Sequence, residues 1–213
     1  MKELHKVSRA LILMAVLPIA AAAESQNLLK DPGFEMRTPA SEGGWRQFET
    51  SFNTEARART GERSMFNGGF SRTVPNPPYF IGMVSGSYQE LSAEPGSRWR
   101  LTGYGATREL PLESSAFGIL QVSFFDADGN DLGTVETAAT DSAKAKTSNE
   151  INKGSPGGEW IFLDTGIATA PDNTTHIHAF TLYVDYSGSN ISQGVHFDDL
   201  MLCELADDEE TCD

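Results

Sequence analysis

Hydrophobic and polar residues alternate along several short stretches of the chain, which is the pattern of β-strands with one buried face. The clearest stretches are Arg98 to Ala106, Phe117 to Phe125, Thr175 to Tyr186 and Gly194 to Leu202. Weaker strands are expected at residues 45–52, 63–66, 87–91, 132–137 and 160–167. Turns rich in Gly, Pro and Asn separate these stretches, and no useful helical period follows residue 23. The pattern predicts an all-β domain, either a β-sandwich or a jelly roll.

Other segments lack this alternation. Residues 67–78 are rich in Gly, Asn and Pro, so a stiff loop is expected that leads into the aromatic residues Tyr79 and Phe80. Residues 138–158 are mostly small and polar without any period, which predicts a mobile insertion, with a short helix near Asp141 to Lys146 as the alternative. Asn27 to Glu35 is broken by Pro32-Gly33, which predicts two short strands joined by a kink.

The stretch from Val195 to Leu202 combines alternation with two adjacent carboxylates, Asp198 and Asp199. Neighbouring side chains of a strand point to opposite faces, so one carboxylate must point to the interior of the sheet or its rim. A buried carboxylate is costly unless it is paired or bound to a metal. We therefore expect the first and last strands to meet, with Asn27 to Glu35 completing a cation site.

The first residues read as a secretory signal peptide. Basic residues Lys2, Lys6 and Arg9 precede an apolar run over residues 10–20, and Ala21 to Ala23 fits the small-residue cleavage rule. A membrane anchor is the alternative, but the run is short for a bilayer. The chain is thus divided into a signal peptide (1–23), one domain (24–204) and an acidic tail (205–213), and it is expected outside the cell or in the periplasm.

Charge and cysteine content narrow the choice of partners. The formal net charge is −14, and loss of residues 1–23 makes it more negative because they hold three basic residues and one acidic residue. Such a chain repels nucleic acid, anionic lipid and acidic polysaccharide, and it favours neutral partners or calcium. Cys203 and Cys212 are expected to form a disulfide that closes a short loop around the acidic tail.

An ordered set of short motifs runs through nearly the whole of the chain after residue 23. The set comprises Asn27 to Glu35, Thr60 to Ser64, Tyr88 to Leu91, Glu94 to Leu101, Phe124 to Asn130, Thr169 to Pro171 and Val195 to Leu200. In this order it resembles the carbohydrate-binding modules with a galactose-binding-like jelly roll, in particular families four, nine and twenty-two. The resemblance implies a non-catalytic domain that binds sugar, and each motif by itself is weak.

The resemblance also implies a structural calcium ion near the joined termini. Its side-chain ligands would be Glu35 and Asp198, with Asp199 as the substitute for Asp198, and carbonyls near Gly33 and Gly61 would complete the shell. Calcium prefers such oxygen ligands. The alternative is that Glu35 pairs with Arg63 while Asp198 caps a bulge.

The expected ligand is a neutral polysaccharide in a groove on the concave sheet of a monomer. Sugars bind to aromatic faces and planar polar groups. If Leu182 and Val184 are core, the groove side holds Tyr104, Gln121, Tyr183 and Asp185, and the loop aromatics Trp45 and Tyr79 wall it. For each of these residues, the alternative is core packing or a position on a solvated face. The three Trp residues are scattered, which favours a soluble glycan chain over a flat crystalline surface.

Other readings remain open. His176-x-His178 places two imidazoles on one strand face, as a transition-metal pair or an ordinary polar face. The segment Asp126 to Asn130 resembles the start of a calcium loop, but a hairpin turn explains it better. Alternatives for the whole protein are an adhesive or structural extracellular β-sandwich and a small polysaccharide lyase or hydrolase. No nucleophile triad or phosphate loop is found in the sequence.

Overall fold

The computed structural model describes residues 26–36, 44–69, 72–75, 78–113, 115–137, 144–187 and 191–212, with the side chains of residues 72–81 left aside. The expected signal peptide lies outside these residues. The described chain is all-β and contains no helix. Accordingly, within those ranges no helix is long and apolar enough to cross a bilayer.

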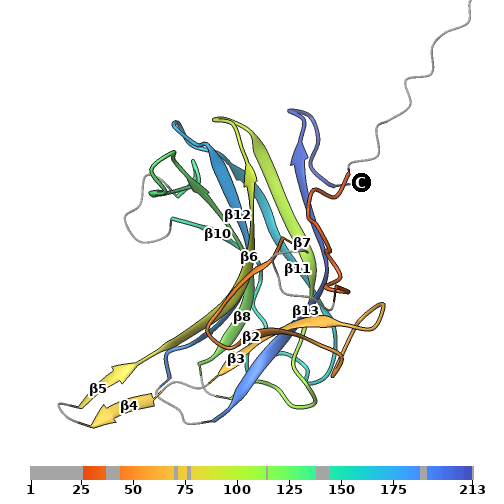
Figure 1. Ribbon diagram of the computed structural model, residues 1–213, viewed down its shortest axis with the longest axis vertical. Coiled ribbons are helices and arrows are strands. Elements are labelled where there is room, and N and C mark those ends of the chain that lie inside the picture. The colour runs from red at the N-terminus through yellow and green to blue at the C-terminus, as the bar shows by residue number, and fades with distance from the viewer. Residues whose placement is uncertain are drawn as a thin grey trace, which may run out of the picture.

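Two antiparallel sheets form a sandwich (Figure 1). The first sheet has the order β1 (Arg46–Phe48), β6 (Met83–Ser92), β12 (His176–Asp185), β8 (Phe117–Phe125) and β10 (Lys146–Thr147), with β9 (Asp131–Gly133) paired to β8. The second sheet has the order β11 (Ile161–Thr169), β7 (Arg98–Ala106), β13 (Gln193–Leu205), β3 (Ser64–Gly69) and β2 (Ser51–Thr54). A separate hairpin of β4 (Arg72–Pro75) and β5 (Pro78–Ile81) projects from one end (Figure 1).

The predicted strands with the clearest alternation are all present, and the bounds of β7 and β8 coincide with the predicted ones. Several expectations about the weaker segments were wrong. The single strand expected at residues 45–52 is two strands, β1 and β2, which belong to different sheets. The stiff loop predicted at residues 67–78 is instead the end of β3 followed by the β4–β5 hairpin. Within the predicted mobile insertion, Lys146 pairs with Val122 of β8 and buried Ile151 bridges to Gly118, so residues 144–158 belong to the fold. Sequence periodicity misses such short pairings because they hold too few residues to show a period.

Large side chains from both sheets fill the interior. Trp99 and Leu101 of β7 meet Leu120 and Phe124 of β8, and each is at most 2% exposed. Full burial of each such side chain contributes roughly 1.5–3 kcal/mol of transfer free energy. The alternation predicted for β7 and β8 therefore selects the correct core residues.

The N-terminal segment lies against the last long strand, as predicted, although it forms turns rather than strands. The Leu28 N–H donates to the Leu202 carbonyl at 2.9 Å. The Asn27 side chain donates to the Leu200 carbonyl at 2.7 Å and accepts from the Leu202 N–H at 3.2 Å. These bonds fix residues 26–36 beside the two aspartates of β13.

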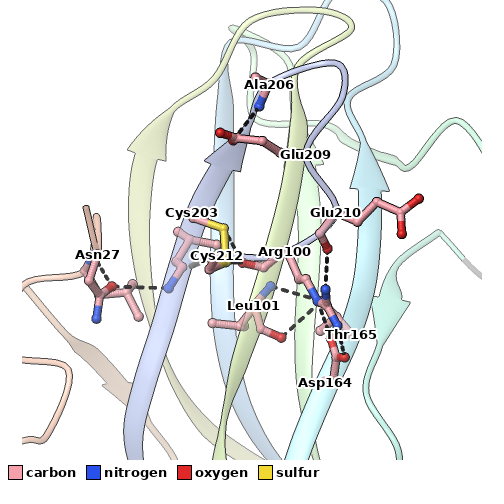
Figure 2. The surroundings of a disulfide bond; sticks show 12 residues. Asn27, Arg100, Leu101, Asp164, Thr165, Cys203, Ala206, Glu209, Glu210 and Cys212 are labelled. Atoms are coloured by element: carbon pink, nitrogen blue, oxygen red, sulfur yellow. Dashed lines mark hydrogen bonds and ion pairs between the residues drawn. A yellow bond between two sulfur atoms is a disulfide. The ribbon is translucent and has the colours of Figure 1, made fainter. Parts of the chain in front are cut away.

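The C-terminal residues fold back over the outer face of the second sheet (Figure 2). The predicted disulfide between Cys203 and Cys212 is present, with the two Cα atoms 5.7 Å apart. The Arg100 guanidinium donates to Asp164 Oδ1 at 2.9 Å and also to the Glu210 carbonyl. A covalent bond and an arginine thus hold the acidic tail.

Candidate functional site

The outer face of the first sheet is set by the alternation of its central strand, β12. Ile177, Ala179 and Tyr183 of β12 are fully buried in the core. Because successive strand residues point to opposite faces, His176, His178 and Phe180 point outward. In register, His178 lies opposite Glu90 of β6 and Ser123 of β8, while Phe180 lies opposite Tyr88 and Gln121.

This register brings ring side chains from three strands into contact. We name these residues the aromatic row: Tyr88, Phe125, His176, His178 and Phe180. The His178 ring lies at its centre, with its centroid 4.8 Å from that of Tyr88 and 4.1 Å from that of Phe125. His176 stacks on Phe125 at 5.6 Å, and Phe180 lies 5.2 Å from Tyr88. All of these side chains are half-buried, so part of each remains accessible to solvent.

Polar groups border the aromatic row. Glu90 Oε2 lies 3.4 Å from His178 Nε2 and 3.6 Å from the Arg46 guanidinium. On the other side, Gln121 Nε2 donates to Ser123 Oγ at 3.2 Å. Burial lowers the pKa of His178, and this effect outweighs the opposing attraction of Glu90. The lowered pKa favours the neutral imidazole at neutral pH, and Arg46 offsets the charge of Glu90 beside the row.

This arrangement suits a ligand with apolar faces and a hydroxylated rim. A pyranose ring stacks its C–H faces on aromatic rings, while carboxylate and amide groups bind its hydroxyls. Of the predicted ligand residues, the half-buried Gln121 lies on this face.

The prediction for Tyr183 and Asp185 was wrong, because both are completely buried. The Tyr183 hydroxyl donates to Asp185 Oδ2 at 3.4 Å, and Asp185 Oδ1 accepts from the Ser187 N–H at 2.9 Å. Burial raises the pKa of Tyr183. The error is a shift of one residue, which exchanges the two faces of a strand. Strand β12 is apolar on both faces at this end, since Leu182 and Val184 are also buried, and its sequence does not reveal which face is the core.

The other predicted ligand residues lie elsewhere. Tyr104 belongs to the second sheet, with the Arg59 guanidinium 3.5 Å above its ring and Phe162 at 5.4 Å, so it does not share a face with Gln121. Trp45 is 2% exposed and packs on Phe34 at 4.8 Å, so it is a core residue rather than a wall of the site. Tyr79 lies in β5, and its side chain is not among those that the structure describes.

Sequence reasoning missed most of the aromatic row. The signal was the i, i+2 spacing of His176 and His178, which placed both on one face but was read as a metal pair or a polar face. The cross-strand partners Tyr88 and Phe125 complete the row only through strand order and register. Strand order and register cannot be read from any short stretch of the sequence.

The carboxylates expected to hold calcium lie around the turn at residues 59–63. Asp198 Oδ2 accepts from the Arg59 N–H at 2.6 Å, and Thr60 Oγ1 donates to Asp199 Oδ1 at 2.5 Å. Glu35 Oε1 accepts from the Glu62 N–H at 3.1 Å. A β-carbon placed on Gly33 would lie 3.8 Å from Asp198 Oδ1 and 3.9 Å from Asp199 Oδ1. The expected residues therefore gather in one region, where Glu35 binds backbone N–H groups rather than the Arg63 guanidinium.

The chemistry of these residues fits a hard divalent cation. Asp198 is fully buried, and burial raises its pKa to about 6, with the neighbouring Asp199 charge adding to the shift. A cation relieves both effects. Among the described residues, however, no group of three His, Cys, Asp or Glu side chains is arranged to hold a metal. Backbone carbonyls would have to supply the remaining ligands.

Comparison with known proteins identifies the fold. No protein-family model and no curated protein matches the sequence. Among solved structures, the C-terminal family 22 carbohydrate-binding module of Clostridium thermocellum Xyn10B matches at 12% identity over 86% of this chain and 97% of that chain, with a TM-score of 0.51. A xylan-binding domain of family 22 matches at 12% identity over 84% and 97%, with a TM-score of 0.50.

A third match is a two-module chain of the same Xyn10B, a family 22 module with a glycoside hydrolase module, complexed with xylohexaose. It matches at 14% identity over 84% of this chain and 28% of that chain, with a TM-score of 0.51. Identities this low establish the fold alone. The chain therefore has the jelly-roll fold of the carbohydrate-binding modules that its sequence resembles.

Proposed function

We propose that this chain is a secreted, non-catalytic protein that binds a neutral polysaccharide on the outer face of the first sheet. The aromatic row carries the proposal, because its half-buried rings lie in contact across three strands. Such rings offer stacking surface for successive sugar residues. Glu90 and Gln121 border the rings and supply hydrogen-bonding groups at the rim.

The charge of the molecule favours a neutral ligand. Its formal net charge of −14 repels acidic polysaccharides at low salt, while Arg46 balances Glu90 beside the row. The related fold of xylan-binding domains adds support for a carbohydrate ligand in general. The alternative is an adhesive role, in which the same face would bind a protein. The polysaccharide-array experiment below separates sugar binding from this adhesive role.

Binding suits this face better than cleavage. Hydrolysis of a glycosidic bond requires two positioned carboxyl groups on either side of it. The row consists of rings, and the Glu90 carboxylate at its rim is already engaged by Arg46 and His178. A lyase or hydrolase would also release shorter chains, which the same experiment detects.

The test is a polysaccharide-array screen of residues 24–213, followed by calorimetry and product analysis. We expect binding without cleavage, and loss of binding in Tyr88→Ala and Phe125→Ala. Phe52→Ala is the matched control, since Phe52 is 46% exposed on the second sheet and its removal should leave affinity unchanged. A folded protein that binds no glycan would refute the proposal and favour the adhesive role.

We also propose a structural calcium ion held by Glu35, Asp198 and Asp199, with carbonyls near Gly33 and Gly61. The ion would neutralise the buried Asp198 and link the N-terminal segment to β13. We expect excess calcium to raise the melting temperature, since an ion at about 100 times its Kd adds roughly 2.7 kcal/mol of stability. A melting temperature that is equal in calcium and in chelator would contradict this. Glu55→Gln is a control outside the proposed ligand set.

A further inference from the structure

We infer that the bound polysaccharide carries methyl-bearing substituents, such as O-acetyl groups, and that an apolar shelf beside the aromatic row receives them. The inference rests on the proposed function and deepens it, because it names the chemistry of the ligand. The shelf belongs to the outer face of the first sheet and follows the aromatic row across β1, β6, β12 and β8. Its residues are Phe48, Val84, Phe117, Ile119, Leu182 and Val184.

Two rows of paired strand positions make up the shelf. In the first row, Leu182 of β12 lies opposite Gly86 of β6 and Ile119 of β8, and Phe48 of β1 also lies opposite Gly86. The remaining shelf residues form the second row. Paired positions point to the same face, and Leu182 follows Phe180 by two residues, so the first row lies about 7 Å from the rings.

The shelf faces solvent rather than the core. Leu182 and Ile119 are 7% and 6% exposed, whereas their inward-pointing neighbours Tyr183 and Leu120 are completely buried. The half-buried shelf side chains, which a ligand can reach from solvent, are Phe48, Val84 and Phe117. The shelf therefore has a nearly closed floor and an accessible rim, both made of hydrocarbon.

Two glycines allow rings to lie close to the backbone at the two ends of the shelf. A β-carbon on Gly86 would lie 2.9 Å from Phe48 Cζ and 2.7 Å from Leu182 Cδ2, so these two side chains meet over the glycine. A β-carbon on Gly82 would collide with the ring of Tyr186, which is 59% exposed. Phe48 thus lies at the end next to the aromatic row, and Tyr186 lies at the far end.

The two sides of the aromatic row differ in chemistry. On one side, the side chains of Arg46 and Glu90 are 64% and 42% exposed, so both can bind sugar hydroxyls. On the other side, the shelf offers only hydrocarbon contacts from its side chains. A hydroxyl placed there loses water without gaining a partner, which costs free energy, whereas a methyl group gains from leaving water. A chain with methyl-bearing substituents therefore matches both sides, and a plain hydroxylated chain matches one.

Continuity with the aromatic row favours the sugar chain itself as the occupant of the shelf. A sugar ring stacked on Tyr88 or Phe180 lies beside Phe48 and Leu182, which are one register step away. Its substituent then reaches the shelf while the chain stays on the rings. A second copy of this protein is a poorer occupant, because a net charge of −14 on each copy opposes self-association at low salt.

The test compares xylohexaose with its partially O-acetylated and O-methylated forms by calorimetry. We expect each substituted ligand to bind about fivefold more tightly, which is the gain from burying about one methyl group. Equal affinity for all three ligands would overturn this inference and leave the proposed function standing. A gain for the acetyl ester alone would indicate recognition of its carbonyl and would also overturn the inference. If none of the three binds, the inference fails together with binding of neutral β-linked chains.

Variants of the shelf provide the second arm. Val84→Thr and Phe48→Ser should reduce the preference to below about twofold and keep the affinity for unsubstituted xylohexaose. Val135→Thr and Phe52→Ser are the matched controls, since these residues are 51% and 46% exposed outside the shelf, and both should keep the preference. Thermal melting verifies that each variant is folded.

A preference that survives in both shelf variants would overturn the inference. Sedimentation tests the competing occupant of the shelf, a second copy of this protein. We expect a monomer, and a dimer that Phe48→Ser dissociates would show that a second copy covers the shelf and would overturn the inference.

Discussion

The outer faces of the two sheets carry the same kinds of side chain but differ in what covers them. On the first sheet, the rings of the aromatic row are half-buried. On the second sheet, His196 contacts Phe66 at 5.0 Å, yet His196 is fully buried. Burial lowers the pKa of His196 to about 4, with Arg108 and Arg57 adding to the shift, so this histidine is neutral and structural.

Two segments cover parts of the second sheet, while Phe52 and Phe162 stay 46% and 49% exposed. In the turn region, Arg59 lies over Tyr104 at 3.5 Å and Arg57 lies over Trp160 at 5.3 Å. At the other end, the disulfide and Arg100 hold the acidic tail (Figure 2). Aromatic and histidine content therefore does not identify a binding face, and the segments that pack over each face decide it.

The largest expected effect comes from removing two rings of the aromatic row on the first sheet. The double variant Tyr88→Ala/Phe125→Ala should weaken oligosaccharide binding about 100-fold, because two stacking contacts are lost. The matched double variant Phe52→Ala/Phe162→Ala removes rings that are 46% and 49% exposed on the second sheet, and it should keep wild-type affinity. Calorimetry decides between the faces, and equal losses in both doubles would contradict the assignment.

The second-largest effect tests the disulfide that holds the acidic tail against the second sheet. Cys203→Ser/Cys212→Ser opens a loop with a sequence separation of 9 residues and should lower the free energy of unfolding by about 2.5 kcal/mol. Urea denaturation measures this loss, and sugar affinity should stay unchanged because the tail covers the other sheet. A drop in affinity at constant fold would show that the two faces are coupled.

A smaller effect distinguishes two glycines with similar backbone angles. Gly61 has φ of 63°, and a β-carbon there would lie 2.1 Å from Glu35 Oε1, whereas Gly96 has φ of 79° and open space around it. Both changes to Ala impose backbone strain of roughly 1 kcal/mol. Gly61→Ala should cost about 1–2 kcal/mol more, because Glu35 must move. If urea denaturation shows the same loss of unfolding free energy for Gly61→Ala and Gly96→Ala, Glu35 does not pack tightly against the turn at Gly61.

The smallest effect concerns the Arg100–Asp164 pair beneath the tail. Hydrogen bonds from Arg100 lower the pKa of Asp164, so the pair stabilises the fold above the usual carboxyl pKa and loses this contribution as pH falls through the lowered value. Asp164→Asn should cost about 1 kcal/mol near neutral pH and nothing in strong acid. Glu55→Gln is the control, since Glu55 is 56% exposed in its pair with Arg63. Urea denaturation at both pH values gives the difference.

The fold was predictable because its strands are long and alternate clearly. Trp99 and Leu101 on β7, and Val122 and Phe124 on β8, were correctly assigned to the core from period alone. Alternation failed on β12, where Tyr183 and Val184 are both buried and either face resembles a core. The short pairing of Lys146 and the bridge of Ile151 were also missed, since neither has a period to detect.

By itself, the sequence determined the all-β class, the bounds of β7 and β8, the meeting of the two termini and the pairing of the two cysteines. These follow from local alternation, turn residues and composition, which are properties of neighbouring residues. Only the tertiary structure decided that Tyr88, His178 and Phe125 form one row and that Tyr104 lies under Arg59 on the opposite sheet. Strand order, register and the packing of loops are long-range choices made by burial of the whole core, and no local window contains them.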